Sequence, residues 1–154
     1  MAGSRHDTPA VAARLDDFLC FWIYAAEHAF SRAYKPLLAD IGLTYPQYLV
    51  MTVLWEEDDQ SVGQLGGKLS LESSTLTPLL KRLEAEGLLS RHRDTQDERV
   101  VRVKLTQTGD KLRQRAAKIP ACILSATGMN LQELGKLRDQ ITQLTKQLED
   151  SASA

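Results

Sequence analysis

The chain has 154 residues, of which 43% are hydrophobic and 25% are charged; this is typical of one soluble globular domain and excludes disordered, collagen-like and membrane proteins. A formal net charge of -1 excludes a polycation that coats nucleic acid, so a DNA binder of this balance must concentrate its positive charge locally. Residues 1–12 lack the apolar core of a secretory signal, and no apolar run approaches the ~20 residues that cross a bilayer, so we expect a cytoplasmic protein without membrane contact.

The first predicted element is a long amphipathic helix that runs from Leu15 to Gly42. Its apolar stripe repeats at spacings of three and four residues and consists of Leu15, Phe18, Leu19, Trp22, Ala26, Ala29, Phe30, Ala33 and Leu37. Three further apolar side chains, Phe21, Ile23 and Tyr24, lie off this stripe. We therefore expect the helix to pack on more than one neighbour, as a helix shared between two subunits does.

Two shorter helices follow, and each begins with a capping box, in which a hydroxyl residue and a glutamine three residues later cap each other's backbone amides. Thr44 with Gln47 opens the first of these helices, and Ser61 with Gln64 opens the second. The acidic run Glu56–Asp59 between them is predicted to be a loop.

A turn near residues 70–73 leads into a fourth helix, which carries a leucine-rich apolar face and ends at Gly87. A proline beyond the first turn of a helix removes a backbone hydrogen bond. The position of Pro78 therefore predicts that this helix begins late, near Ser73 or Ser74.

Two short segments, Leu88–Arg93 and Val100–Leu105, are predicted to pair as a β-hairpin around the polar connection Asp94–Arg99. The second segment alternates apolar residues with Arg102 and Lys104. Because the connection is longer than a two-residue turn, we expect its basic tip to project into solvent as a wing.

The rest of the chain is predicted to be helical. Thr106 caps another helix, Pro120 interrupts it, and Asn130 with Glu133 opens a last helix. This last helix carries a heptad-like apolar seam that consists of Leu134, Leu137, Ile141, Leu144 and Leu148. About two heptads are too few for an independent coiled coil, so we expect the seam to complete a dimer interface with the first helix.

Short helix, turn, helix and hairpin follow one another in the order of a winged helix, whose second helix enters the major groove while the wing contacts the backbone or minor groove. The predicted DNA-binding residues are Ser73, Ser74, Thr75, Thr77, Lys81, Arg82, Arg91, Arg93, Asp97 and Arg99. Arg99 is predicted to insert into the minor groove, with Asp97 orienting its guanidinium. Two alternatives stay open: serine and threonine favour the start of any helix, and a solvated hairpin carries ion pairs without a DNA role.

The span Thr75–Thr106 contains TLTPLLKRLEAEGLL and DERVVRVKLT, which resemble the MarR family of winged-helix regulators. The stretches LDDFLCFWIY, YKPLL and LTYPQYLVM resemble one subfamily, the organic hydroperoxide resistance regulators. The resemblance implies a mainly α fold with a small β-hairpin wing, a winged helix-turn-helix with N- and C-terminal dimerisation helices. We therefore divide the chain into a disordered tail (1–12), an N-terminal dimerisation helix (13–42), a winged helix-turn-helix DNA-binding domain (43–106) and C-terminal dimerisation helices (107–154).

In that subfamily, the cysteine that matches Cys20 is the peroxide-sensing thiol, and tyrosines that match Tyr34 and Tyr45 hydrogen-bond to it from the partner subunit. Helix geometry is compatible: Tyr24 lies one turn from Cys20, whereas Tyr34 is fourteen residues away, ~21 Å along a helix axis, so its contact requires an intersubunit site. Oxidation of Cys20 would re-space the two recognition helices of the dimer. Some members carry a second, resolving cysteine in the C-terminal dimerisation region, and Cys122 lies in the corresponding part of this chain. The resemblance thus implies an intersubunit disulfide between Cys20 and Cys122, and the alternative is a disulfide between Cys20 and a small external thiol.

We therefore expect a redox-responsive transcriptional repressor that binds double-stranded operator DNA as a homodimer when reduced and is released when organic hydroperoxides oxidise Cys20. The alternative is a MarR-type repressor induced by an aromatic small molecule at the dimer interface, with Cys20 structural. The sequence contains no catalytic, cofactor or metal motif, and His6, His28 and His92 are scattered, so we expect neither an enzyme nor a bound cofactor or metal.

Overall fold

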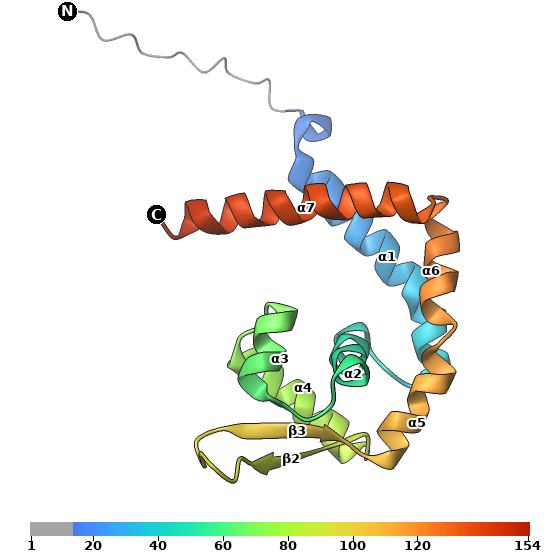
Figure 1. Cartoon of the computed structure of the whole chain (residues 1–154). Coiled ribbons are helices and arrows are strands. Elements are labelled where there is room, and N and C mark those ends of the chain that lie inside the picture. Colours follow the sequence, from blue (N-terminus) through green and yellow to red (C-terminus); the bar gives the residue numbers. More distant parts are fainter. Residues whose placement is uncertain (1–13) are drawn as a thin grey trace, which may run out of the picture. The chain divides into compact units, whose positions relative to one another are not determined.

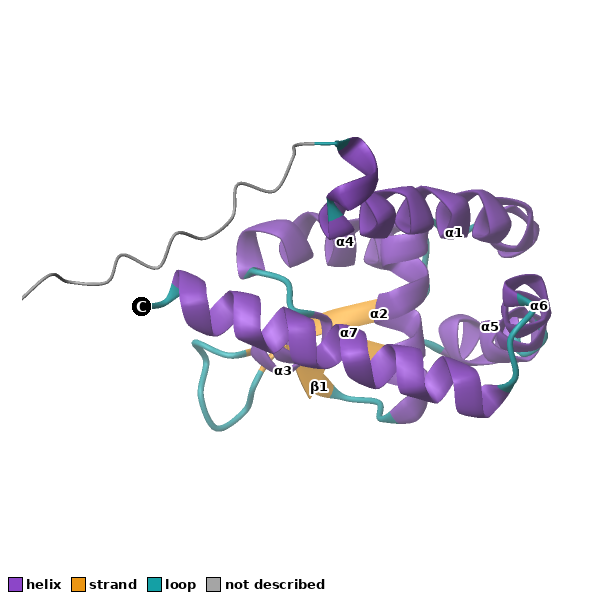
Figure 2. Ribbon diagram, turned by 90° about the horizontal axis from the view of Figure 1, so that it is seen from above, coloured by secondary structure: helices purple, strands orange, loops and turns teal. Residues whose placement is uncertain are grey.

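The computed structural model describes residues 14–154, so the tail predicted at residues 1–12 lies outside the described residues. Figures 1 and 2 show that the described chain is mainly helical with a small sheet. The elements in chain order are η1 (Leu15–Asp17), α1 (Leu19–Ile41), α2 (Tyr45–Glu56), β1 (Gln60–Ser61), α3 (Val62–Leu69), α4 (Ser73–Ala85), β2 (Leu89–Arg93), β3 (Val101–Leu105), α5 (Gln107–Ala116), α6 (Ile119–Thr127) and α7 (Leu131–Ala152). The chain divides into two units between Arg32 and Ala33, within α1, and each unit is described by itself.

The described part of the first unit consists of η1 and the first half of α1. The prediction of one helix from Leu15 is wrong, because Phe18 has an extended backbone (φ -88°, ψ 105°) that separates η1 from α1. The indole Nε1 of Trp22 donates to the carbonyl oxygen of Asp16 at 2.9 Å and ties the two helices together. Seven large apolar side chains of this unit are exposed: Leu15, Phe18, Leu19, Trp22, Ile23, Tyr24 and Phe30. The described chain thus leaves this apolar surface uncovered.

In the second unit, α2 and α3 begin where the capping boxes predict. The Thr44 hydroxyl accepts from the Gln47 amide at 3.3 Å, and the Gln47 side chain accepts from the Thr44 amide at 2.9 Å. Ser61 and Gln64 cap each other in the same way. α3 ends at Leu69, and the next residue, Ser70, has a left-handed backbone (φ 53°, ψ 42°) and turns the chain toward α4.

The fourth helix begins at Ser73, as predicted, and Gly87 with φ 76° follows its end. Even with this late start, Pro78 lies inside α4, beyond its first turn, so its position does not explain where the helix begins. Pro78 is exposed, so water can solvate the carbonyl group that its missing N–H leaves without a helical donor.

The sheet has three antiparallel strands in the order β1-β3-β2. β2 and β3 form the predicted hairpin, with Arg91 opposite Val103. β1 pairs with the other edge of β3 and was not predicted, since the residues after the acidic run were expected to lead straight into a helix. A strand of two residues is too short to show the alternation that identifies strands in a sequence.

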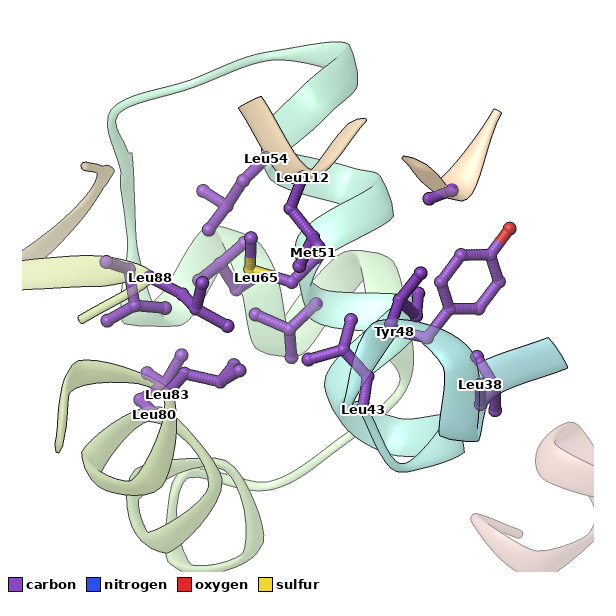
Figure 3. Close-up of a cluster of buried hydrophobic side chains, with 14 of the residues drawn as sticks. Leu38, Leu43, Tyr48, Met51, Leu54, Leu65, Leu80, Leu83, Leu88 and Leu112 are labelled. Atoms are coloured by element: carbon purple, nitrogen blue, oxygen red, sulfur yellow. The ribbon is translucent and has the colours of Figure 1, made fainter. Parts of the chain in front are cut away.

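One apolar core joins α2, α3, α4 and the sheet (Figure 3). Its large, fully buried side chains include Met51 and Leu54 of α2, Leu65 of α3, Leu76, Leu80 and Leu83 of α4, and Val103 of β3. Each such side chain stabilises the fold by about 1.5–3 kcal/mol relative to an exposed one. The elements that carry the predicted DNA-binding residues therefore form one packed body.

The three C-terminal helices follow the sequence signals closely. The Thr106 hydroxyl accepts from the Gly109 amide at 3.0 Å, Pro120 stands at the start of α6, and Asn130 forms the predicted capping box of α7 with Glu133. α7 has no buried residue in the described chain. Its apolar seam is exposed at Leu137, Ile141 and Leu148.

The predicted fold class is confirmed: the chain is mainly α and carries a small hairpin wing on a winged helix. The boundaries between dimerisation and DNA-binding segments stay predictions. No single helix of residues 14–154 is long and apolar enough to cross a membrane, although α1 and α2, taken together as a bent pair, have that length and composition.

Candidate nucleic-acid interface and cysteine site

The polar residues predicted to enter the major groove lie on the outer side of α4. Ser73, Ser74 and Thr75 are exposed in its first turn, and Thr77 is half-buried. Glu72, the N-cap residue, makes no side-chain cap to the first amides of α4. Lys81 and Arg82, further along the same helix, are both exposed. The short side chains at the start of α4 let a nucleic acid approach the helix closely, and the two exposed cations further along can contact its phosphates.

The wing presents one arginine at its tip. Arg99 exposes 91% of its side chain and is held by Asp97 through Nε–Oδ1 and Nη2–Oδ2 contacts of 3.0 and 3.2 Å. The predicted ion pair is therefore present. Hydrogen bonds from the Arg99 side chain and backbone amide also hold the pKa of Asp97 below its usual value. A minor-groove role for Arg99 stays a prediction.

Two other predicted cations of the wing have partners within the protein. Arg91 donates from its side chain to Glu84 Oε1 at 3.3 and 3.0 Å and from its backbone amide to Glu84 Oε2 at 2.8 Å. This pair joins β2 to α4. Arg93 is exposed and donates to the carbonyl oxygen of Glu98 at 2.7 Å. The side chain of Arg91 is 24% exposed, against 91% for Arg99, so Arg91 is less available to DNA than Arg99.

A cleft of about 380 Å³ brings several of the predicted DNA-binding residues together. Ser73 and Thr77 of α4 line it together with Arg91 and Arg99 of the wing. Ser61, Val62 and Gly63, at the start of α3, also line it. Sequence reasoning missed these three residues, although the capping box at Ser61 had located the helix end that they form.

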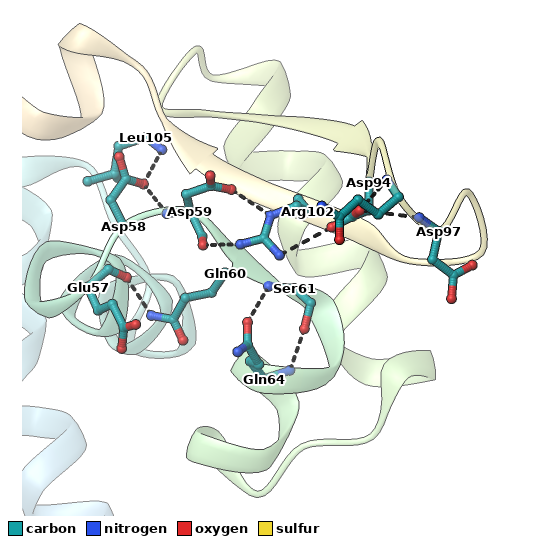
Figure 4. A network of polar contacts seen from close by, with 11 residues as sticks. Glu57, Asp58, Asp59, Gln60, Ser61, Gln64, Asp94, Asp97, Arg102 and Leu105 are labelled. Atoms are coloured by element: carbon teal, nitrogen blue, oxygen red, sulfur yellow. Dashed lines mark hydrogen bonds and ion pairs between the residues drawn. The ribbon is translucent and has the colours of Figure 1, made fainter.

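The acidic turn after α2 also has a structural role that the sequence did not reveal. Figure 4 shows Asp59 and Asp94 on either side of Arg102, a half-buried residue of β3. These contacts join residues that lie 43 and 8 positions apart in the chain. The contact between Asp59 and Arg102 could not be predicted from the spacing of residues within one helix or hairpin, because it joins segments 43 positions apart.

The predicted sensing cysteine is the second residue of α1, in its first turn, and its side chain is exposed. Tyr24, one turn further along, is 62% exposed. Its ring packs on that of His28, with the ring centroids 4.2 Å apart. Cys20 therefore stands on an accessible helix face among the exposed apolar side chains of the first unit.

The other two predicted tyrosines belong to an aromatic cluster in the second unit. The ring centroid of Tyr34 lies 4.9 Å from that of Tyr45 and 6.0 Å from that of Tyr48. Burial, followed by the neighbouring phenols, raises the pKa of Tyr34 to about 12. Its phenol is thus neutral, and able to donate a hydrogen bond, throughout the physiological range. Tyr48 was missed, although it lies three residues from Tyr45 on α2.

The second cysteine, Cys122, is exposed in the first turn of α6, shortly after Pro120. Both cysteines are free thiols. Within residues 14–154, no group of three or more histidine, cysteine or acidic side chains is placed to hold a metal ion. The sites that the described structure offers are therefore the α4 and wing surface and the two exposed thiols.

Comparison with known proteins decides the family. A family model described as transcriptional regulator SarA/Rot matches residues 32–116. An organic hydroperoxide resistance transcriptional regulator of Bacillus subtilis (strain 168) is 40% identical over 135 residues, which cover 88% of this chain and 92% of the relative. The chain belongs to the SarA/Rot and MarR family of winged-helix transcriptional regulators. The predicted family is confirmed, and the identity supports the organic hydroperoxide resistance subfamily.

Two other relatives of this MarR-type regulator extend the comparison. The HTH-type transcriptional regulator TtmR of Methylorubrum extorquens (strain PA1) is 49% identical over 140 residues, which cover 91% of this chain and 72% of TtmR. The structure of reduced AbfR bound to DNA has a TM-score of 0.74 and 35% identity, covering 88% of this chain and 94% of AbfR. The structure of disulfide-formed AbfR, a protein of Staphylococcus epidermidis, has a TM-score of 0.61 and 33% identity over 92% and 94% of the two chains.

Proposed function

We propose that this regulator is a redox-responsive repressor, which binds operator DNA as a homodimer while Cys20 is reduced and releases it when an organic hydroperoxide oxidises Cys20. The observation that carries the proposal is the placement of Cys20, exposed in the first turn of α1 among exposed apolar side chains. The 40% identity to an organic hydroperoxide resistance regulator and the overlap with reduced, DNA-bound AbfR support it.

Binding to DNA would use α4 in the major groove and Arg99 at the minor groove. Ser73, Ser74 and Thr75 are small enough to let the backbone of α4 approach the base edges, while Lys81 and Arg82 reach phosphates or guanine. The exposed guanidinium of Arg99 is already oriented by Asp97. Less side-chain freedom is lost when a pre-organised cation binds.

The homodimer would cover the apolar surfaces that the described chain leaves exposed. These surfaces are the aromatic face around Trp22 and the seam of α7 that includes Ile141. Exposed apolar patches of this kind mark protein–protein contacts in soluble proteins. A symmetric dimer would also present two copies of α4 to the two halves of a palindromic operator.

The sensing reaction is a two-electron oxidation of sulfur. The Cys20 thiolate would attack the terminal oxygen of the hydroperoxide, so that an S–O bond forms, the O–O bond breaks and the alkoxide leaves as an alcohol after protonation. Trp22 on α1 and Phe18, which precedes that helix, are exposed and lie two residues from Cys20 in the sequence, and they suit an alkyl or aryl substituent of the peroxide. A neutral phenol from the partner's Tyr34, kept protonated by its raised pKa, would stabilise the thiolate by donating a hydrogen bond.

The sulfenic acid would then condense with a second thiol, lose water and form a disulfide. Cys122, exposed on α6, is the internal candidate for this thiol, and a small external thiol is the other. A new bond at the dimer interface would change the spacing of the two α4 helices. One oxidation per release event makes the protein a sensor in the cytosol, not a peroxidase that turns over.

A titration of operator DNA binding tests this proposal. The operator is first selected from a pool of random duplexes by the reduced protein, and its affinity is then measured for wild type, Cys20→Ser and Cys122→Ser, with and without cumene hydroperoxide. We expect peroxide to release wild type, a reductant to restore its binding, and Cys20→Ser to stay bound. Release of Cys122→Ser only when an external thiol is present would assign the resolving role to Cys122.

The same variants separate the rival mechanisms. If peroxide leaves wild type bound but an aromatic acid releases wild type and Cys20→Ser equally, Cys20 is structural and the protein is a ligand-induced repressor. If each protomer consumes many equivalents of peroxide in the presence of a thiol, the protein is a peroxidase. If reduced wild type selects no DNA, the proposed interface itself is wrong.

A further inference from the structure

The acidic turn between α2 and β1 holds strand β3 at the base of the wing. One oxygen of the Asp58 carboxylate accepts from the backbone amides of Asp59 and Leu105, each at 2.8 Å. The carboxylate of Asp59 accepts from Arg102 Nε at 2.9 Å, and the Asp59 carbonyl oxygen accepts from Arg102 Nη2. Asp59 has a left-handed backbone with φ 54°, which is unfavourable for a residue with a Cβ atom. The contacts to Arg102 compensate for this conformation.

The same arginine also reaches the turn of the wing. Arg102 Nη1 lies 3.4 Å from Asp94 Oδ2, and Asp94 Oδ1 accepts from the backbone amides of Gln96 and Asp97 at 2.7 and 3.3 Å. Asp97 in turn binds the guanidinium of Arg99. A continuous series of hydrogen bonds thus runs from the acidic turn to the tip of the wing, and Figure 4 shows its first steps.

Burial and charge indicate that Arg102 serves the protein and not the DNA directly. Its side chain is 28% exposed, against 91% for Arg99. The hydrogen bond from Arg102 lowers the pKa of Asp59, and the backbone amides of Gln96 and Asp97, together with Arg102, lower the pKa of Asp94. Both carboxylates are therefore charged at neutral pH, and the Arg102 charge lies between two anions. Arg102, which is half-buried and paired with two carboxylates, is therefore less available to a phosphate than the exposed Arg99.

We propose that Arg102 is a positioning residue for DNA binding, which acts with Asp59 and Asp94 to fix the wing turn so that Asp97 presents Arg99 to the operator. This inference rests on the proposed binding of operator DNA and adds residues to it. It assigns a function to the acidic turn, which the sequence alone predicts only to be a loop.

The variant Asp59→Asn distinguishes positioning of the wing from simple electrostatic attraction of DNA. Asp59→Asn removes a negative charge from the face that carries the wing, so long-range attraction of DNA alone would strengthen binding. If Asp59 positions the wing through Arg102, the same variant must weaken operator binding. We expect a loss of roughly threefold to tenfold, which lies within the range for residues that affect binding without touching the ligand.

Arg102→Gln is the companion variant, and Lys104→Gln is its control. Lys104 lies on the same strand, is exposed and carries the same charge. We expect Arg102→Gln to weaken operator binding by roughly threefold to tenfold more than Lys104→Gln does. In the background of Arg99→Ala, we expect Arg102→Gln to add little further loss, because a residue that acts through Arg99 is coupled to it.

Hydrogen exchange in the DNA-free protein gives a measurement that does not depend on the proposed function. Asp59→Asn and Arg102→Gln should speed exchange of the wing-turn amides, residues 94–100, and leave the α4 amides as slow as in wild type. Unchanged exchange in the wing turn would overturn the proposal even if reduced wild type binds no DNA.

The DNA titrations provide the remaining outcomes. An Asp59→Asn protein that binds the operator as tightly as wild type, or more tightly, would refute a positioning role. Full additivity of Arg102→Gln with Arg99→Ala would mean that Arg102 acts independently of the wing tip. If wild type itself binds no DNA, the proposed function is wrong. Hydrogen exchange of the wing-turn amides would still show whether Arg102 fixes the wing turn.

Discussion

Substitution of Gly109 by alanine should destabilise the protein by about 2–2.5 kcal/mol. Gly109 lies in the first turn of α5, against the chain at the base of the wing. A Cβ atom there would stand 1.9 Å from the Leu88 carbonyl oxygen, whereas real Cβ contacts essentially never fall below 3.0 Å. The oxygen belongs to a backbone carbonyl group, so α5 and the start of the hairpin must separate.

The magnitude follows from the hydrogen bonds that this separation breaks. The Thr106 amide donates to Leu88 O at 3.1 Å, the Thr106 hydroxyl donates to Gly87 O at 2.6 Å, and Trp55 Nε1 donates to Gly109 O at 2.9 Å. Three bonds at about 1 kcal/mol each, less the ~0.5–1 kcal/mol that alanine normally adds to a helix, leave about 2–2.5 kcal/mol. For a chain of this length, such a loss lowers Tm by roughly 5–10 °C.

Thermal unfolding of all variants at one fixed protomer concentration measures this effect, because the concentration-dependent contribution of dimerisation is then the same for each protein. Gly67→Ala is the matched control, because Gly67 also lies within a helix but has nothing within 4 Å of its Cβ position. We expect Gly67→Ala to raise stability by about 0.5–1 kcal/mol. A Gly109→Ala protein that is as stable as wild type, or gains like the control, would refute the steric reasoning.

Three further predictions concern charge, phenol ionisation and assembly. Hydrogen bonds from Arg91 lower the pKa of Glu84 from its ordinary 4.5, so the ionised carboxylate stabilises the fold above pH 4.5 and loses this effect as pH falls through the lower folded value. Urea unfolding of Glu84→Gln should therefore show a shallower loss of stability below pH 4.5 than wild type, and equal slopes would contradict the coupling. Because the pKa of Tyr34 is raised from 10.0 to about 12, the free energy of unfolding should stay constant below pH 10 and fall between pH 10 and 12. In an ultraviolet titration, Tyr34→Phe should lack the phenol ionisation near pH 12. If that ionisation persists in the variant, it belongs to another tyrosine. Ile141→Asp should dissociate the proposed dimer in sedimentation experiments while Gln140→Asp, on the same helix, leaves it intact; an unchanged dimer would exclude the α7 seam from the interface.

Signals that act over a few residues predicted the local structure well. The three capping boxes, which begin at Thr44, Ser61 and Asn130, each open a helix at the expected residue. Gly87 ends α4 with the positive φ that glycine adopts without strain. Such features depend only on residues within about one helical turn of each other, so they can be predicted from the sequence alone.

Contacts between distant segments were beyond the same reasoning. β1 forms because Gln60 and Ser61 pair with β3, and a segment of two residues has no sequence pattern that predicts this pairing. Arg91 was counted among the DNA-binding cations, yet its partner is Glu84 of the preceding helix. The sequence does not show whether an arginine pairs with a carboxylate of the protein or with a phosphate of DNA, because the partner depends on the fold.

These distant contacts also bear on how oxidation could release DNA under the proposed mechanism. Glu84 and Arg91 join α4 to β2, Arg102 joins β3 to the acidic turn, and the close approach of Gly109 to Leu88 joins the hairpin to α5. A winged helix joined at three such points resists internal deformation, because moving the wing against the rest of the winged helix breaks charged hydrogen bonds on both strands. Oxidation of Cys20 is then expected to act by displacing two rigid winged helices relative to each other, since α4 helices that no longer match the half-site spacing lose the operator together.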